Sequence, residues 1–149
     1  MLIEYIIEIF HNPVVIAGAL AWFSAQILKT ITNAIVSREF DPARLLGDGG
    51  MPSAHSATVT AVAISAGREA GFQSAVFGVA FFFALVVMHD AMGVRRETEK
   101  QTKVLKSLVE SMSGEYSPEE KLKEFVGHTP TQVLAGFCLG IIVSLLCYF

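Results

Sequence analysis

The distribution of apolar positions divides the chain into long hydrophobic blocks separated by short charged stretches. From Val14 to Val36 the sequence stays largely apolar, over a length that can cross roughly 30 Å of hydrocarbon. Residues 74–89 and 129–149 form similar blocks, and a shorter block at 53–67 is rich in alanine and serine. We therefore expect four transmembrane helices.

Small residues recur at helical spacing in two of these blocks. The first stripe is Ala57, Ala61 and Ser65, and the second is Gly136, Gly140 and Ser144. Such stripes allow two helix backbones to approach closely. We expect the first helix to be buried among the others, and the second stripe to pack either within the bundle or against another copy of the chain.

Two amphipathic segments complete the predicted fold. Residues 2–11 carry Glu4 and Glu8 one helical turn apart among apolar residues, which predicts a helix at the membrane interface. Between residues 97 and 124, charged residues alternate with apolar ones at helical spacing and predict a surface helix that Gly114 interrupts. The prediction is an all-α integral membrane bundle of about four transmembrane helices with an N-terminal interfacial helix. It forms a single membrane domain, residues 1–149, with a cytoplasmic amphipathic insert at about 95–127.

The charged residues are few and unevenly placed. The chain of 149 residues is 52% hydrophobic and 17% charged, with a net charge of −3, whereas roughly 25% charged residues are usual in soluble domains. No basic face or basic run dominates, so we expect no nucleic-acid partner. Nine of the 11 lysines and arginines fall in the two loops on one side of the predicted bundle. The positive-inside rule then predicts an inner (cytoplasmic) membrane protein with these loops in the cytoplasm.

Two histidines stand at predicted helix starts on that same side. His55 lies in the first turn of the second span, and His128 immediately precedes the fourth. Helix starts carry free backbone N–H groups and a positive dipole end, which attract anions. Nearby residues can add a hydroxyl or positive charge: Ser53, Lys29, Arg95 and Arg96. This set suits metal-free phosphoryl transfer, in which one histidine attacks phosphorus and the other protonates the leaving oxygen.

Two motifs resemble those of a known superfamily. Pro52-Ser53-Ala54-His55 is similar to the Pro-Ser-Gly-His motif of the type 2 phosphatidic acid phosphatases, a superfamily that includes the vanadium haloperoxidases. The run from Gly127-His128-Thr129 to Gly136 resembles the superfamily's last motif, His-x-x-x-Asp followed by Val-Leu-Ala-Gly. With these motifs and the run from Asp90 to Arg96, nearly the whole chain resembles the small bacterial divergent branch of that superfamily.

The resemblance implies a role for each candidate residue. His128 would be the nucleophile and His55 the general acid, while the phosphate would be held by Ser53, Lys29, and Arg95 or Arg96 in place of an arginine that is Leu122 here. Gln132 occupies the position of the aspartate that orients the nucleophile; its carbonyl can still accept an imidazole hydrogen bond, but without charge. The expected reaction is hydrolysis of a membrane lipid phosphate or diphosphate through a phosphohistidine, with no metal and no cofactor. Expected partners are the lipid phosphate substrate, membrane lipid and a second copy in a homodimer.

Other interpretations remain open from the sequence. Lys29 shares a helix face with Gln26 and Asn33, and its ammonium either faces the bundle interior or extends to the membrane interface. His89 and Asp90 could ligate a metal, or Asp90 could pair with Arg95 or Arg96. Because Gln132 replaces the aspartate, the chain could also be a degenerate protein that binds or transports an anionic lipid or phosphate. A purely structural helical bundle is the remaining alternative.

Overall fold

The fold is built from helices. The computed structural model describes residues 2–38, 50–113 and 128–147, and every regular element within these ranges is a helix, as the sequence predicts. The helices are α1 (Leu2–His11), α2 (Pro13–Ser37), α3 (Ala54–Ala70), α4 (Ala75–Met92), α5 (Val94–Ser113) and α6 (Pro130–Leu146). The all-α class is therefore confirmed for the described part of the chain.

Two of these helices, α2 and α4, are long and apolar enough to cross a membrane. The helix α6 is apolar but has 17 residues, and α3 also has 17 residues, many of them alanine, serine and threonine. By length and composition, the described residues thus support two spans rather than the expected four. The four-span topology remains a prediction.

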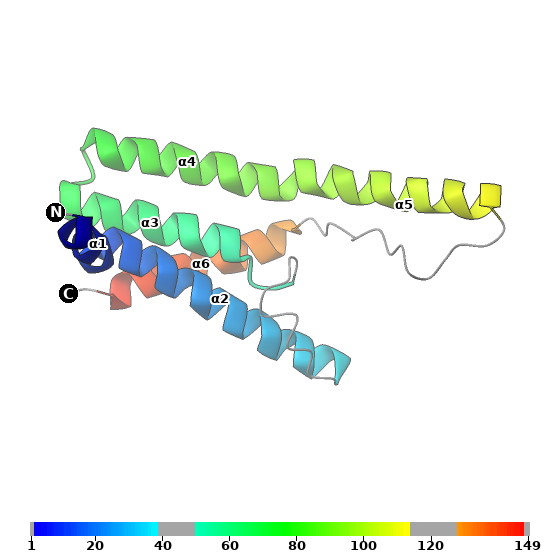
Figure 1. Cartoon of the computed structure of the whole chain (residues 1–149), viewed down its shortest axis with the longest axis horizontal. Coiled ribbons are helices and arrows are strands. Elements are labelled where there is room, and N and C mark those ends of the chain that lie inside the picture. The colour runs from blue at the N-terminus through cyan, green and yellow to red at the C-terminus, as the bar shows by residue number, and fades with distance from the viewer. Residues whose placement is uncertain (1, 39–49, 114–127, 148–149) are drawn as a thin grey trace.

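The helix α3 lies at the centre of the bundle (Figure 1). It contacts α2, α4 and α6, whereas α2 and α4 do not contact each other within the described residues. The helices α3 and α6 begin at the same end of the bundle, and α2 and α4 end there (Figure 1). Both histidine-bearing helix starts are therefore brought to one end, beside a gap between α2 and α4.

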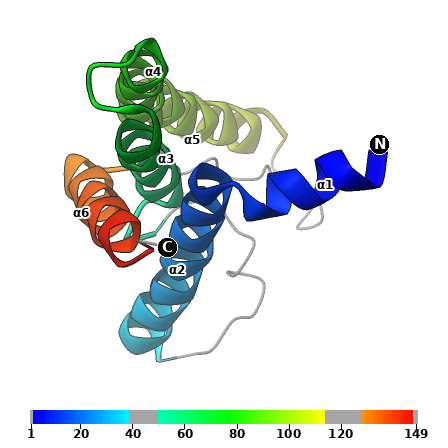
Figure 2. The ribbon, with the colours of Figure 1, turned by 90° about the vertical axis from the view of Figure 1, so that its left-hand side faces the viewer.

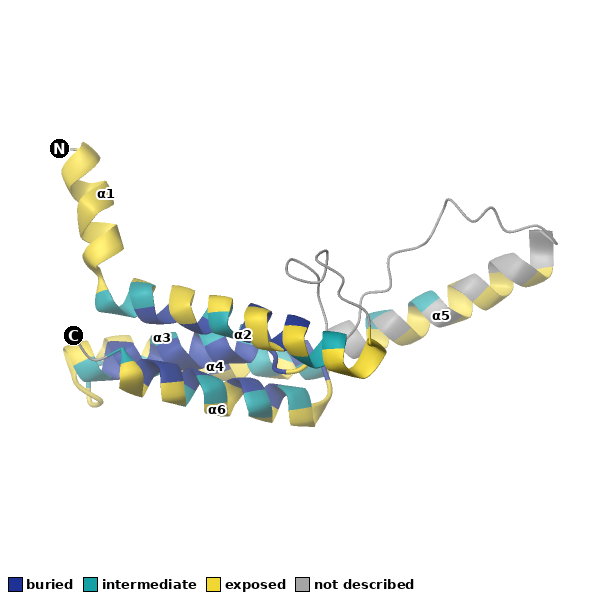
Figure 3. Ribbon diagram, turned by 90° about the horizontal axis from the view of Figure 1, so that it is seen from below, coloured by how far each residue is buried: buried dark blue, intermediate teal, exposed yellow. Residues whose placement is uncertain are grey.

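The interior of the bundle is made of small side chains. Its main cluster consists of Ala17, Ala21, Ala25, Ala54, Ala57, Ala61 and Val143. Large apolar side chains point outward instead, so the outer faces of the helices are mostly exposed (Figure 3). Phe82, for example, is 68% exposed. This distribution is typical of helices that pack through small residues and turn their large residues toward lipid.

The stripe of Gly136, Gly140 and Ser144 packs against α3. A Cβ atom at Gly136 would collide with the carbonyl oxygen of Ser53, and one at Gly140 would collide with that of Ala57. The two helix backbones are therefore in direct contact. Of the two arrangements expected for this stripe, the structure shows packing within the bundle.

The two amphipathic helices lie outside the bundle. The helix α1 has no buried residue and leaves α2 at a wide angle, at the end away from the starts of α3 and α6 (Figure 2). The helix α5 contacts only α4 among the described elements, and it projects beyond the bundle at the histidine end. It ends at Ser113, before Gly114, as predicted. The rest of the predicted insert, residues 114–127, lies outside the described residues.

Arg68 connects α3 to the end of α6, and its loss is expected to destabilise the bundle. Its Nη1 donates a hydrogen bond to the backbone oxygen of Ser144, one of the last carbonyls of α6, which lack partners inside the helix. We expect Arg68→Met, which keeps most of the apolar stem, to lower the free energy of unfolding by about 1–3 kcal/mol. Thermal unfolding in detergent measures this, with the exposed neighbour Glu69→Gln as the control. An unchanged melting temperature in Arg68→Met would contradict the assignment.

Candidate active site

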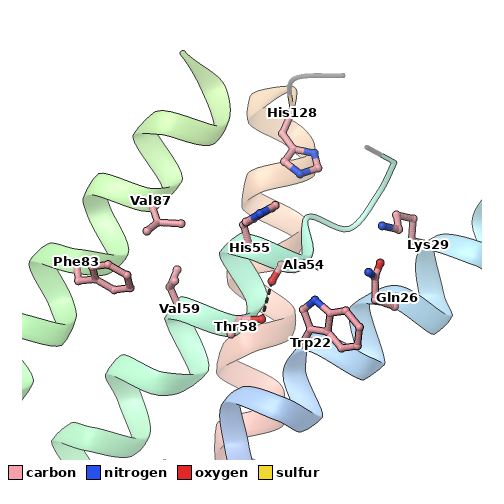
Figure 4. Close-up of a pocket in the computed structure, with 10 residues that line it drawn as sticks. All are labelled: Trp22, Gln26, Lys29, Ala54, His55, Thr58, Val59, Phe83, Val87 and His128. Carbon is pink, nitrogen blue, oxygen red and sulfur yellow. Dashed lines mark hydrogen bonds between the residues drawn. The ribbon is translucent and has the colours of Figure 1, made fainter. Parts of the chain in front are cut away.

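A pocket of about 390 Å³ lies over the first turns of α3, between α2 and α4 (Figure 4). Its polar lining residues are Gln26, Lys29, His55, Thr58 and His128. Its apolar lining includes Trp22, Val59, Phe83 and Val87. The pocket therefore combines a polar group of side chains with an apolar wall contributed by three helices.

Capping interactions fix the start of α3, and with it His55. Ser53 is the N-cap residue, and its Oγ accepts hydrogen bonds from the backbone N–H of Ser56 at 3.4 Å and from the Ser56 hydroxyl at 3.1 Å. The backbone N–H of Ser53 donates to the carbonyl oxygen of Gln132 at 3.0 Å. This last bond joins the first turn of α3 to the first turn of α6. It therefore fixes the position of His55 relative to the segment that carries His128.

Contacts with the end of α4 and the start of α6 fix the position of His128. Its backbone N–H donates to the carbonyl oxygen of Ala91, near the end of α4, at 3.0 Å. The next residue, Thr129, is the N-cap of α6 and forms a capping box with Gln132. The side chain of His128 is only 4% exposed and lines the pocket.

Gln132 orients the imidazole of His128. Its Oε1 accepts the backbone N–H of Thr129 at 3.0 Å and lies 3.3 Å from Nδ1 of His128. The bond from Thr129 identifies this atom as the amide oxygen, which can only accept. Nδ1 of His128 can therefore donate to this oxygen, and in a neutral imidazole that arrangement leaves the lone pair on Nε2. Gln132 thus makes the contact that the resemblance assigns to an orienting residue.

The two histidine rings lie side by side in the pocket. Their centroids are 5.9 Å apart and their planes are tilted by 59°. Lys29 approaches from α2 on the other side of the pocket (Figure 4), and only 5% of this residue is exposed. Three potential anion-binding side chains therefore converge from α2, α3 and the residue before α6.

Gly50 allows Lys29 to occupy this position. It has a φ of 86°, and a Cβ atom there would lie 2.7 Å from Cγ of Lys29, so the backbone passes directly over the lysine stem. The adjoining backbone is fixed because the hydroxyl of Thr32 donates to the carbonyl oxygen of Met51 at 2.8 Å. The buried position of Lys29 favours the interior alternative over extension to the interface.

The backbone adds to the positive character of this end of the bundle. The helices α3 and α6 both begin here, so two positive dipole ends meet beside Lys29. Free N–H groups at such helix starts bind phosphate readily. The combination of two imidazoles, one buried ammonium and two helix starts suits a tetrahedral anion.

Among the other predicted site residues, Ser53 is not part of the pocket lining. Ser53 is fully buried beneath it and is engaged as a cap. Arg95 and Arg96 fall in the first turn of α5, but their side chains lie outside the described residues. His89 and Asp90 are neighbours on α4, and the described segments contain no group of three or more residues that could hold a metal ion. The phosphate-binding roles of Ser53, Arg95 and Arg96 remain predictions.

Two of the pocket residues that were assigned no role from the sequence lie on α2 with Lys29. Trp22 and Gln26 lie on α2 at positions seven and three residues before Lys29, which places all three on one helical face. The sequence does contain this spacing. It could not show that the face is turned toward His55 rather than toward another helix.

The chain is similar to known protein sequences over most of its length. The sequence model of a family described as the Divergent PAP2 family matches residues 10–143. A protein of Bacillus subtilis (strain 168), called "Uncharacterized membrane protein YuiD", is 36% identical over 155 aligned residues, which cover 95% of this chain and 98% of the relative. No solved structure matches the chain. Both sequence matches extend over the helices that form the pocket.

Proposed function

The chain belongs to the Divergent PAP2 family, and from its paired histidines we propose that it is a membrane enzyme that hydrolyses a lipid phosphate or diphosphate without a metal ion. One observation carries this proposal. The rings of His55 and His128 lie 5.9 Å apart in a pocket that also contains the buried Lys29. A phosphoryl group bound in this pocket next to the two rings would contact both imidazoles and face the ammonium.

In the proposed first step, His128 acts as the nucleophile. Nε2 attacks phosphorus, so that a P–N bond forms while the bond from phosphorus to the leaving oxygen breaks. Protonated His55 donates its proton to that oxygen, and the lipid alcohol departs. The positive charge that develops on the His128 ring is partly offset by Gln132 Oε1, which accepts a hydrogen bond from Nδ1–H.

The second step regenerates the enzyme. His55, now neutral, takes a proton from a water molecule, and the resulting oxygen attacks phosphorus. The P–N bond breaks, inorganic phosphate leaves, and Nε2 of His128 recovers its lone pair. During both steps, the Lys29 ammonium and the positive dipole ends of the two helix starts stabilise the charge on the equatorial oxygens. In the proposal Arg95 and Arg96, at the start of α5, supply further positive charge, and Ser53 contributes to the phosphate site.

Several features support a membrane location and a lipid substrate. The outer faces of the helices expose large apolar side chains, α2 and α4 are long enough to span a bilayer, and the Bacillus relative is called a membrane protein. The pocket wall formed by Trp22, Phe83 and Val87 would receive hydrocarbon next to the phosphate site. The charged helix α5 projects from the histidine end. We propose that this end faces the cytoplasm, in accord with the distribution of lysine and arginine.

Phosphate release by the detergent-purified protein tests the proposal. Phosphatidic acid, phosphatidylglycerol phosphate and a polyprenyl diphosphate are supplied with and without EDTA, and the protein is analysed by mass spectrometry for a phosphoryl adduct. We expect turnover that EDTA does not inhibit and an adduct on His128. Inhibition by EDTA would favour a metal site near His89 and Asp90. The absence of turnover with every substrate, in protein shown to be folded, would refute hydrolysis of these classes.

The uncharged Gln132 favours a second candidate function. In catalytic His–carboxylate pairs, the negative charge stabilises the imidazolium that forms during reaction. Here an amide makes the corresponding contact at 3.3 Å, which orients His128 but supplies no charge. The second candidate is a protein that binds or transports an anionic lipid or phosphate. Tight binding of vanadate or phosphate without any turnover would favour it.

Gln132→Glu is expected to raise turnover about tenfold or more. Glutamate is nearly isosteric with glutamine and is a usual capping-box partner, so the start of α6 should be retained. Its carboxylate would accept the same two hydrogen bonds and would add the missing negative charge. Steady-state rates measure the change, and Thr131→Glu is the control because it adds equal charge to the same exposed turn. A lower rate in Gln132→Glu would show that the neutral amide suits the site better.

A further inference from the structure

Gln26 carries a buried hydrogen-bond acceptor next to the proposed phosphate site. The residue is 7% exposed, and its amide lies between Trp22 and Lys29 on the pocket side of α2 (Figure 4). Its Oε1 atom has no hydrogen-bond partner in the part of the chain that the structure describes. Leaving such an oxygen unpaired is costly, and buried polar atoms in proteins rarely lack a partner. A bound ligand could supply the missing donor.

The phosphate itself is a poor candidate for that donor. A fully ionised phosphate has only acceptor oxygens, and these are better matched by the Lys29 ammonium and the N–H groups of the helix starts. A donor on the part of the substrate next to the phosphate would pair this oxygen. A hydroxyl or an N–H group would meet this requirement.

The order of side chains along α2 gives the position of this donor. Gln26 is three residues before Lys29 and Trp22 is seven before it, so they lie about 4.5 Å and about 10 Å further along the helix axis. The pocket thus presents an ammonium, then an amide oxygen, then an indole on one face. A matching ligand has a phosphate, a hydrogen-bond donor on the second carbon from the ester oxygen, and then hydrocarbon.

We propose that Gln26 is a specificity-determining residue that selects phosphate esters of amphiphiles with a free hydroxyl or N–H beside the phosphate. A monoacyl glycerol phosphate, whose second hydroxyl is free, has this arrangement. Fully acylated glycerol phosphates and polyprenyl phosphates lack the donor and would leave the amide oxygen unpaired. A site built around such a hydrogen bond rejects analogues that lack it more strongly than an apolar pocket rejects a missing methylene. This inference rests on the proposed function.

The test compares two ligands that differ in one hydroxyl. A 1-acyl glycerol 3-phosphate and its 2-deoxy analogue, with the same acyl chain, are supplied to the protein in lipid nanodiscs. Binding constants and kcat/KM are measured for wild type and for Gln26→Leu. We expect wild type to favour the hydroxyl compound by about tenfold or more. In Gln26→Leu the two ligands should behave within about twofold of each other, because the acceptor is gone.

Gln26→Leu should fold, since it replaces an unpartnered buried oxygen with an apolar group, and its melting temperature should equal or exceed that of wild type. Thr60→Val is the matched control, because Oγ1 of Thr60 is also a buried oxygen without a hydrogen-bond partner among the described residues, but Thr60 does not line this pocket. It should keep the preference of wild type for the hydroxyl compound.

Two outcomes would overturn the inference. One is a wild type that does not distinguish the two ligands, and the other is an equal loss for both ligands in Gln26→Leu, which would mean that Gln26 contacts the phosphate. Failure of the proposed function gives a different result. If neither ligand is hydrolysed, the binding constants still show whether the hydroxyl is selected, whereas turnover without discrimination refutes the selectivity alone.

Discussion

Replacing His128 with glutamine is expected to lower phosphate release by at least about 10³-fold and to abolish the phosphoryl adduct. Glutamine has no imidazole nitrogen that can attack phosphorus. Its size is close to that of histidine, and the backbone bond from residue 128 to Ala91 does not depend on the side chain. The variant should therefore fold. Phosphate release and intact-protein mass measure the two effects.

His55→Gln is compared with His128→Gln, because the proposal gives the two histidines different roles. Without the general acid, adduct formation from esters with a poor leaving group should slow by about 10²–10⁴-fold, while the first-turnover burst of p-nitrophenol from p-nitrophenyl phosphate should slow far less. Without the base for the second step, the adduct on His128 should accumulate. An adduct on His55 in the wild type would reverse the two roles, and full activity in His128→Gln would refute the nucleophile assignment.

Gly136→Ala is expected to produce the largest loss of structure for the smallest change in side chain. The new methyl group would collide with the Ser53 carbonyl oxygen and lie 2.9 Å from Cβ of Ser56, so α6 would have to move away from α3. Overpacking of this kind costs about 1–3 kcal/mol. The same movement would stretch the bond from Ser53 N–H to the Gln132 carbonyl and shift His128 relative to His55, so we expect turnover to fall as well.

Gly78→Ala is the matched control for this prediction. Gly78 also lies within a helix, but a Cβ atom there would meet nothing within 4 Å. This substitution should be neutral or stabilising by up to about 1 kcal/mol, because alanine favours a helix more than glycine does. Thermal unfolding and phosphate release are measured on both variants. A melting temperature and rate for Gly136→Ala equal to those of Gly78→Ala would show that α3 and α6 do not pack as described.

The parts of the fold that depend on local chemistry could be predicted from the sequence. Ser53 and Thr129 cap the two histidine-bearing helices because their hydroxyls accept nearby backbone N–H groups, a requirement that extends over only three residues. The close approach of α6 to another helix followed from the spacing of Gly136 and Gly140. The identity of that other helix did not follow, because either α3 or a second copy satisfies the same spacing.

The parts that depend on three-dimensional arrangement could not be predicted. The pocket exists because α2 and α4 both pack on α3 without meeting, and no local pattern encodes the absence of that contact. The sequence assigns no role to Gly50, whereas in the structure the absence of a side chain there leaves room for the Lys29 stem. The prediction of four spans relied on the apolar character of each block. This character is weaker in α3, because many of its residues are small and suit close helix packing rather than contact with lipid.

The lengths of α3 and α6 have a further consequence for the proposed membrane placement. Each helix has 17 residues, about 25 Å at 1.5 Å per residue, and so falls short of a hydrocarbon layer of about 30 Å. This hydrophobic mismatch would be relieved by local thinning of the bilayer around the pair. Thinning would lower the lipid headgroups toward His55 and His128. The protein should then partition into thinner bilayers in preference to thicker ones, and its activity should rise as the acyl chains of the surrounding lipids are shortened.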